Sequence, residues 1–142
     1  MIAKMNNNLV LLVEDNVDDV TLTEMAFKKG RLGGKLAVVV DGQEALDFLF
    51  YQGKYKNRTP IENPAFILLD LKLPLVSGLE VLKEIRAEKS TSQIPVVVLT
   101  SSIEEKDRTD SYTLGANDFI TKPTGYSHFI ELIQQVKAKW LV

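Results

Sequence analysis

The sequence predicts an α/β fold in which five parallel strands form one sheet with helices on both faces. Three observations indicate this fold: short apolar runs recur along the chain, a segment with helical apolar spacing follows each run, and polar residues stand directly after the runs. Apolar runs without polar alternation are typical of strands buried on both faces of a parallel sheet. A chain of 142 residues with 45% hydrophobic content is expected to form one domain, residues 1–142, with its core at about 8–142.

The composition excludes several classes of protein. The formal net charge is −2, from 17 basic and 19 acidic residues, so the chain lacks the basic surface that direct nucleic-acid binding needs. No apolar segment approaches the roughly 18 residues that span a bilayer, and no signal-peptide hydrophobic region is present, which predicts a cytoplasmic protein without membrane contact. Cysteine is absent and the single histidine, His128, is expected at the surface, so any metal ion would be bound by oxygen atoms.

The first two strands are predicted at residues 9–13 and 36–40. Asn16 is suited to cap the helix between them, because its side chain can accept a backbone N–H bond and acidic residues follow in the first turn. Gly30 is the predicted end of that helix. Asp41 precedes the next helix, whose apolar face consists of Ala45, Leu46, Leu49 and Phe50.

The third strand and helix follow a segment, residues 51–64, that has neither helical nor strand periodicity. Connections in α/β folds usually have about two to six residues, so we interpret this segment as a long loop. Its two tyrosines and three basic residues suggest a surface for a partner protein, although a tolerated insertion would have the same length. The third strand is predicted at residues 66–69, and a turn from Pro74 to Gly78 leads into its helix.

The last two strand and helix pairs complete the pattern. A buried strand is predicted at residues 95–99, and the polar stretch 104–113 is expected to form a short helix. The fifth strand is predicted at residues 118–121, and the helix after it has apolar residues at i, i+3, i+4 and i+7 spacing. These residues are Phe129, Leu132, Ile133, Val136 and Trp140.

Chemically reactive side chains follow the predicted strands. They are Glu14 and Asp15 after the first, Asp70 after the third, Thr100 after the fourth and Lys122 after the fifth. The carboxyl ends of parallel strands share one crevice, so these side chains are expected to converge. Clustered carboxylates repel each other unless a proton or a cation lies between them, and oxygen ligands favour Mg²⁺, with Mn²⁺ as the alternative ion. The ammonium group of Lys122 and the hydroxyl of Thr100 suit phosphoryl oxygens, which predicts a phosphoryl-transfer site.

In order and spacing, these motifs resemble those of the receiver domains of two-component response regulators, such as the bacterial chemotaxis regulator. The motifs in this sequence are Glu14-Asp15, Asp70 with Pro74 and Gly78 beyond it, Thr100, and Lys122-Pro123. The resemblance covers essentially the whole chain and implies the (βα)5 flavodoxin-like receiver fold, with a cis peptide bond before Pro123. The long loop and the absence of an output domain are most similar to small single-domain regulators that are paired with phytochrome-class histidine kinases.

The resemblance implies that Asp70 accepts a phosphoryl group from a kinase phosphohistidine and later loses it to water. The protein would catalyse only its own modification, so it is expected to be a phosphoacceptor signalling protein and not an enzyme. Mg²⁺ would be held by Glu14, Asp15, Asp70 and the backbone carbonyl of Lys72. Lys122 would neutralise a phosphoryl oxygen.

The resemblance also implies a switch. Thr100 would hydrogen-bond the phosphoryl group, the small Ser101 would leave room for that group to enter, and Phe119 would occupy the space that Thr100 vacates. Lys72 and Ser102 stand at positions that tune the lifetime of the phosphoryl group in the family.

Protein partners are implied as well. A sensor histidine kinase, in particular one of phytochrome type, would be the phosphoryl donor. A downstream protein target would recognise the surface formed by residues 104–113, residues 118–121 and the last helix. The same surface is expected to support a homodimer.

Two alternatives of other classes share these residues. An interaction module with a receiver fold could keep the acidic pocket without being phosphorylated, although every required side chain is present. A haloacid-dehalogenase-like phosphatase also uses a nucleophilic aspartate and Mg²⁺. In this sequence Lys72 stands where that class needs its second aspartate, which disfavours the phosphatase.

Overall fold

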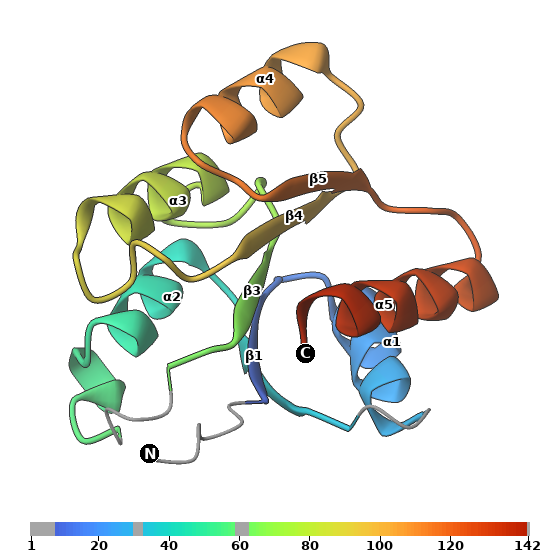
Figure 1. The fold of residues 1–142 in the computed structure, drawn as a ribbon, viewed down its shortest axis with the longest axis horizontal. Helices are drawn as coiled ribbons and strands as arrows, with labels where there is room; N and C mark the ends of the chain where they lie inside the picture. The colour runs from blue at the N-terminus through green and yellow to red at the C-terminus, as the bar shows by residue number, and fades with distance from the viewer. Residues whose placement is uncertain (1–7, 30–32, 59–62, 142) are drawn as a thin grey trace.

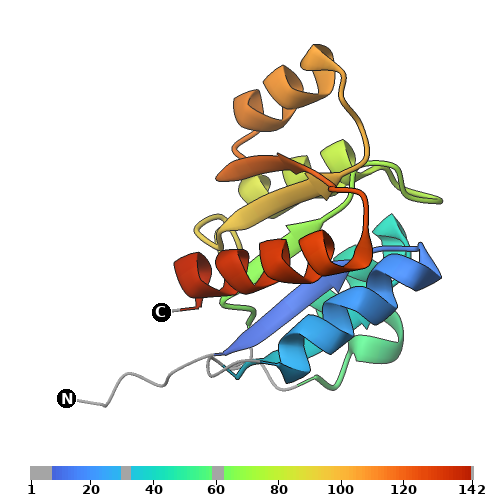
Figure 2. The same cartoon turned by 90° about the vertical axis from the view of Figure 1, so that its right-hand side faces the viewer.

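The structure is a computed structural model that describes residues 8–29, 33–58 and 63–141. Its elements are β1 (Leu9–Val13), α1 (Val17–Lys28), β2 (Lys35–Val39), α2 (Gly42–Leu49), the 3₁₀ helix η1 (Gly53–Tyr55), β3 (Phe66–Leu69), α3 (Gly78–Ala87), β4 (Val96–Thr100), α4 (Glu105–Thr113), β5 (Asp118–Thr121) and α5 (Tyr126–Trp140). The five strands form one parallel sheet in the order β2-β1-β3-β4-β5, which confirms the predicted fold class. In Figures 1 and 2, α1 and α5 cover one face of the sheet and α2 and α3 the other, with α4 beside β5.

Alternate residues of the central strands fill two separate cores. In β1, Leu11 and Val13 pack towards α2 and α3, whereas Val10 and Leu12 pack towards α1 and α5. Strand β3 alternates in the same way, as the two-residue period of a strand requires. A third, smaller cluster consists of Leu71, Val98 and Phe119. In the described ranges, no helix is long and apolar enough to span a membrane.

The register brings the carboxyl ends of the strands level with one another. Val13, at the end of β1, is the partner of Val39 at the end of β2 and of Leu69 at the end of β3. The backbone N–H of Asp70 donates to the carbonyl of Val13 over 3.1 Å, and that of Glu14 donates to Val39 over 3.0 Å. The first residue beyond β1 and the first beyond β3 are therefore still held by the backbone of a neighbouring strand, which fixes where each side chain begins.

The element boundaries agree closely with the sequence prediction. Strands β1, β3 and β5 lie at the predicted residues, β2 begins one residue earlier, and β4 lies one residue later, so that Thr100 is its last residue. Asn16 caps α1 as predicted, because its Oδ1 accepts the N–H of Asp19 over 2.9 Å. Helix α1 ends at Lys28. Gly30, the predicted end, lies outside the described residues.

The segment after α2 is more ordered than predicted. The interpretation as an aperiodic loop is wrong at Gly53–Tyr55, which form η1. The rings of Tyr55 and Phe48 pack edge to face with centroids 5.1 Å apart, and the guanidinium carbon of Arg58 lies 4.1 Å from the Phe48 centroid. Arg58 also donates to the Phe48 carbonyl at the end of α2 over 2.9 Å. Much of the aromatic and basic content that suggested a partner surface therefore covers α2, and residues 59–62 lie outside the described ranges.

Candidate functional site

Three carboxylates surround the ammonium group of Lys122. Its Nζ lies 2.8 Å from Glu14 Oε1, 2.8 Å from Asp19 Oδ2 and 3.1 Å from Asp70 Oδ2. The Lys122 side chain is only 11% exposed. An ammonium group has three N–H donors, and here each has a carboxyl oxygen as its acceptor. The predicted convergence of strand ends therefore occurs for β1, β3 and β5.

The surrounding carboxylates keep Lys122 charged. Burial by itself would lower the pKa of Lys122, but its hydrogen bonds to Asp19 and Glu14 and the negative charge of Asp70 outweigh burial and raise the pKa. The ammonium group is therefore a permanent cation at physiological pH. A fixed cation of this kind can neutralise an oxyanion that forms or binds beside it.

Asp70 is held in place by the backbone around it. The residue is buried, and its Oδ1 accepts the N–H of Leu71 over 2.7 Å. The N–H of Gly78, at the start of α3, donates to the carbonyl of Leu71 over 2.8 Å. A Cβ atom at Gly78 would collide with the backbone of Asp70 and Leu71. The glycine that the sequence assigned to a turn is thus required by the close approach of α3 to the Asp70 loop.

Glu14, Asp15 and Asp70 form an acidic cluster, in which each side chain offers one oxygen within 4.8 Å of the others. Glu14 and Asp70 are buried, whereas Asp15 is exposed. Burial and the charge of Asp70 outweigh the opposing effect of Lys122 and raise the pKa of Glu14 to about 7. The raised pKa reflects chiefly the burial of Glu14 and also the negative charge of Asp70, and a divalent cation at the cluster would favour the ionised carboxylate. An all-oxygen donor set with one solvent-facing member fits Mg²⁺ or Mn²⁺.

The end of β4 lies beside Lys122, whose N–H donates to the Thr100 carbonyl over 2.7 Å, and the residues after it lie under α4. Thr100 is fully buried, and its Oγ1 accepts the N–H of Ser102 over 3.3 Å. The hydroxyl of Ser102 donates to Asp107 Oδ2 over 2.5 Å and accepts the N–H of Glu104 over 3.2 Å, so it faces α4. Ser101 is exposed beside Thr100.

The other predicted positions are Phe119, Lys72 and His128. Phe119 is 6% exposed and packs against Leu71 and Val98, the first of which follows Asp70 directly. The side chain of Lys72 is exposed, and so is His128, as predicted.

The implied cis peptide bond before Pro123 is wrong for this structure, because no peptide bond among the described residues is cis. A bond before proline permits either isomer, with a trans preference of only about 0.5–1 kcal/mol.

Sequence reasoning missed Asp19 as a member of the site. The sequence places Asp19 at a helix N-terminus, where acidic residues stabilise the helix dipole, so a local role accounts for it without any reference to the site. The order of strands and helices could have identified Asp19 as a site residue. A helix that follows the first strand of a parallel sheet starts at the same edge as the strand ends, so its first turn faces the crevice.

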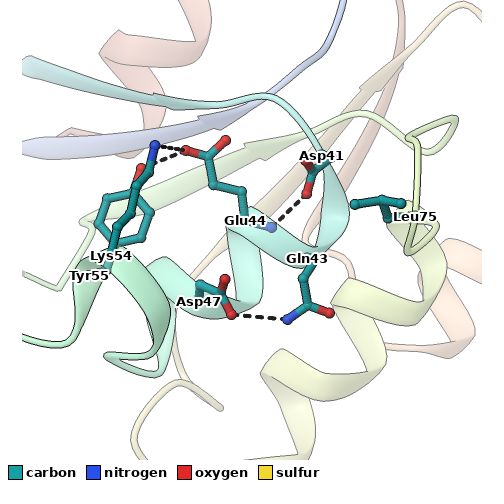
Figure 3. A pocket seen from close by; sticks show the side chains of 7 residues that line it. All are labelled: Asp41, Gln43, Glu44, Asp47, Lys54, Tyr55 and Leu75. Carbon is teal, nitrogen blue, oxygen red and sulfur yellow. Dashed lines mark hydrogen bonds and ion pairs between the residues drawn. The ribbon is translucent and has the colours of Figure 1, made fainter.

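A second hollow, of about 420 Å³, lies along α2 and is shown in Figure 3. Its lining residues are Asp41, Gln43, Glu44, Asp47, Lys54, Tyr55 and Leu75. Glu44 accepts hydrogen bonds from the Tyr55 hydroxyl over 2.7 Å and from the N–H of Val40 over 2.9 Å, and it pairs with Lys54 over 3.1 Å. Burial would raise the pKa of Glu44, but these three partners lower it overall. At this hollow, Glu44 of α2 binds Tyr55 and Lys54 of η1 and so holds η1 against α2.

Comparison with known proteins gives a consistent result. The family model of the response regulator receiver domain matches residues 10–134. The response regulator Rcp1 of Synechocystis sp. is 38% identical over 133 residues, which are 94% of this chain and 88% of Rcp1. The phosphorylated cyanobacterial phytochrome response regulator RcpA superposes with a TM-score of 0.89 at 38% identity, covering 95% of this chain and 94% of RcpA. The Mn²⁺-bound form of Rcp1 has a TM-score of 0.87 at 38% identity, covering 94% of both chains.

Proposed function

The chain belongs to the response regulator receiver domain family, and on this premise we propose that Asp70 is its phosphoacceptor, with the phosphohistidine of a sensor histidine kinase as donor. The observation that carries the proposal is the position of the Asp70 carboxylate. One oxygen is held by a backbone N–H, and the other lies 3.1 Å from the Lys122 ammonium group. The carboxylate is thus fixed in direction beside a permanent cation.

The reaction is a displacement at phosphorus. An Asp70 carboxylate oxygen attacks the phosphoryl group, a P–O bond forms, and the P–N bond to the donor imidazole breaks with its electron pair leaving on nitrogen. Water later attacks the same phosphorus and releases inorganic phosphate, which restores the carboxylate. The chain's own contribution is positioning and charge neutralisation, which account for most of phosphoryl-transfer catalysis.

Within this proposal the acidic cluster holds a divalent cation. Glu14, Asp15 and Asp70 would be its carboxylate ligands, with the backbone carbonyl of Lys72 as a further oxygen donor. When bound, Mg²⁺ or Mn²⁺ neutralises negative charge on the reacting oxygens. Rcp1 has been solved in a Mn²⁺-bound form, which supports this assignment. Lys122 neutralises a second phosphoryl oxygen.

The phosphoryl group would act as a switch by adding about −1.5 to −2 charges and strong acceptor oxygens to the site. Thr100 then turns towards the phosphoryl group, the small and exposed Ser101 leaves room for that group to enter, and Phe119 fills the space that Thr100 vacates. Lys72 and Ser102 modulate how long the group persists. The surface of α4, β5 and α5 changes as a result and serves a downstream protein target or a second copy of this chain.

The donor is proposed to be a phytochrome-type kinase in the cytoplasm. The similarity to RcpA, a cyanobacterial phytochrome response regulator that has been solved in its phosphorylated state, supports this class of donor.

Incubation with Mg²⁺ and acetyl phosphate, followed by mass spectrometry, tests the proposal. We expect one phosphoryl group per chain, stable in acid and labile in base, which Asp70→Asn abolishes and Asp47→Asn on α2 preserves. A wild-type chain that binds Mg²⁺ but gains no mass would overturn the proposal in favour of a receiver-like interaction module that is not phosphorylated.

A further inference from the structure

Asp19 reaches Lys122 from a different part of the fold than the other carboxylates do. Glu14 and Asp70 stand directly after strands, whereas Asp19 lies in the first turn of α1. Its N–H donates to Asn16 Oδ1 over 2.9 Å, and its carbonyl accepts the hydroxyl of Thr23 over 2.8 Å. The backbone of Asp19 is therefore fixed on both sides. Its carboxylate is presented to Lys122 by a rigid helix end.

The three acceptors of Lys122 also differ in what else they do. Glu14 and Asp70 belong to the acidic cluster, and Glu14 in addition accepts the N–H of Asn16 over 3.0 Å. Asp19 is not a member of that cluster. The bond of 2.8 Å between Lys122 and Asp19 is thus the one contact of the ammonium group that neither a cation in the cluster nor a phosphoryl group on Asp70 would claim.

We propose that Asp19 is a positioning residue that anchors Lys122 and keeps its ammonium group aimed at Asp70. The inference rests on the proposed function and gives a role to Asp19, to which the proposed function assigned none. When a phosphoryl group occupies Asp70, one N–H of the ammonium group turns to a phosphoryl oxygen. The N–H bonded to Asp19 stays where it is, so the lysine keeps its place during the reaction.

A simpler role for Asp19 would be to stabilise the dipole of α1, as any acidic residue at a helix N-terminus does. Asp18 offers a matched control, because it lies in the same turn of α1 with the same charge and is exposed. Both Asp18→Asn and Asp19→Asn remove one negative charge from the helix end. Only Asp19→Asn removes a carboxylate from Lys122.

The test is a double-mutant cycle on phosphorylation by saturating acetyl phosphate and Mg²⁺, with Lys122→Gln as the second background. In the wild-type background, we expect Asp19→Asn to slow phosphorylation by about fivefold to tenfold and Asp18→Asn to stay within about twofold of the wild-type rate. In the Lys122→Gln background, where phosphorylation is already slow, we expect Asp19→Asn to change the rate by less than about twofold. Equal rates for Asp18→Asn and Asp19→Asn, or the same loss in both backgrounds, would overturn the proposal.

A second measurement does not depend on phosphorylation. The Nζ protons of Lys122 can be followed by ¹⁵N NMR, where hydrogen bonding to carboxylates slows their exchange with water. We expect faster exchange in Asp19→Asn than in Asp18→Asn, and equal exchange in the two variants would contradict the proposed anchoring of Lys122 by Asp19.

The two proposals fail in different ways. If wild type is not phosphorylated at all, the proposed function and the positioning role fail together. If wild type is phosphorylated and the two variants behave alike, only the role of Asp19 fails.

Discussion

Gly78 donates its backbone N–H to the carbonyl of Leu71 over 2.8 Å, so helix α3 begins in contact with the chain that leaves Asp70. A methyl group at position 78 would overlap the backbone of Asp70 and Leu71. We expect Gly78→Ala to lower the free energy of unfolding by about 1–3 kcal/mol, as overpacking does, and to slow phosphorylation by displacing the Asp70 loop. Urea denaturation and the acetyl phosphate reaction measure the two effects. Glu80→Ala, an exposed change in the same turn, should leave both unaltered.

Divalent-cation affinity should rise with pH. The pKa of Glu14 is raised to about 7, and a protonated carboxyl group is a poor ligand, so protons compete with the cation below that pH. For one competing proton, the apparent Mg²⁺ affinity should increase about tenfold between pH 6 and pH 8. Calorimetric titration at the two pH values measures this change. The Glu14→Gln chain should show a nearly flat response, and an equally flat response in wild type would contradict the prediction.

Glu44 should stabilise the fold only above acidic pH. Its pKa is lower in the folded chain than the ordinary value of 4.5, because the hydrogen bonds from Tyr55, Val40 and Lys54 outweigh burial. The stabilisation is therefore fully present above pH 4.5 and is lost as the pH falls through the folded-state pKa. We expect Glu44→Gln to cost about 1–2 kcal/mol at pH 7 and progressively less as the pH falls through the folded-state pKa, measured by chemical denaturation. Glu24→Gln, at an exposed position on α1, should show no such dependence.

The start of α4 should depend on Asp107. This helix has no side-chain cap at Glu104, and the Ser102 hydroxyl connects the Glu104 N–H to the Asp107 carboxylate. Asp107→Ala should destabilise the protein by about 0.5–1.5 kcal/mol and speed hydrogen exchange in the first turn of α4. Asp110→Ala removes a pair with the fully exposed Lys106, so a much smaller effect on stability and exchange is expected. Similar exchange rates in the two variants would show that the bond between Ser102 and Asp107 does not organise this turn.

Much of the fold and site was predictable because the signals are local and periodic. Apolar runs placed the strands to within one residue, and the topology of a parallel sheet then brought Glu14, Asp70 and Lys122 to one edge. The position of a side chain that directly follows a strand can be predicted in this way, because it depends only on where the strand ends.

The features that were missed depend on packing between distant segments. Lysine side chains are usually exposed, but Lys137 is fully buried, with its Nζ 3.4 Å from the Ala26 carbonyl and 4.7 Å from the Phe27 ring centroid. Burial lowers its pKa. The segment with η1 has no periodicity, so its packing against Phe48 could not be read from spacing. Asp19 had a sufficient local explanation, which concealed its bond to a residue 103 positions away.

Strands β1 and β3 each contribute alternate side chains to the core under α1 and α5 and to the core under α2 and α3. Neither face can therefore unfold without exposing the other, and the two layers form a single cooperative unit. The slowest-exchanging amides in β1 and β3 should report the global free energy of unfolding. Asp70 directly follows the strand that both layers share and its N–H is bonded to the Val13 carbonyl, so its amide should be among those that exchange only when the whole molecule opens.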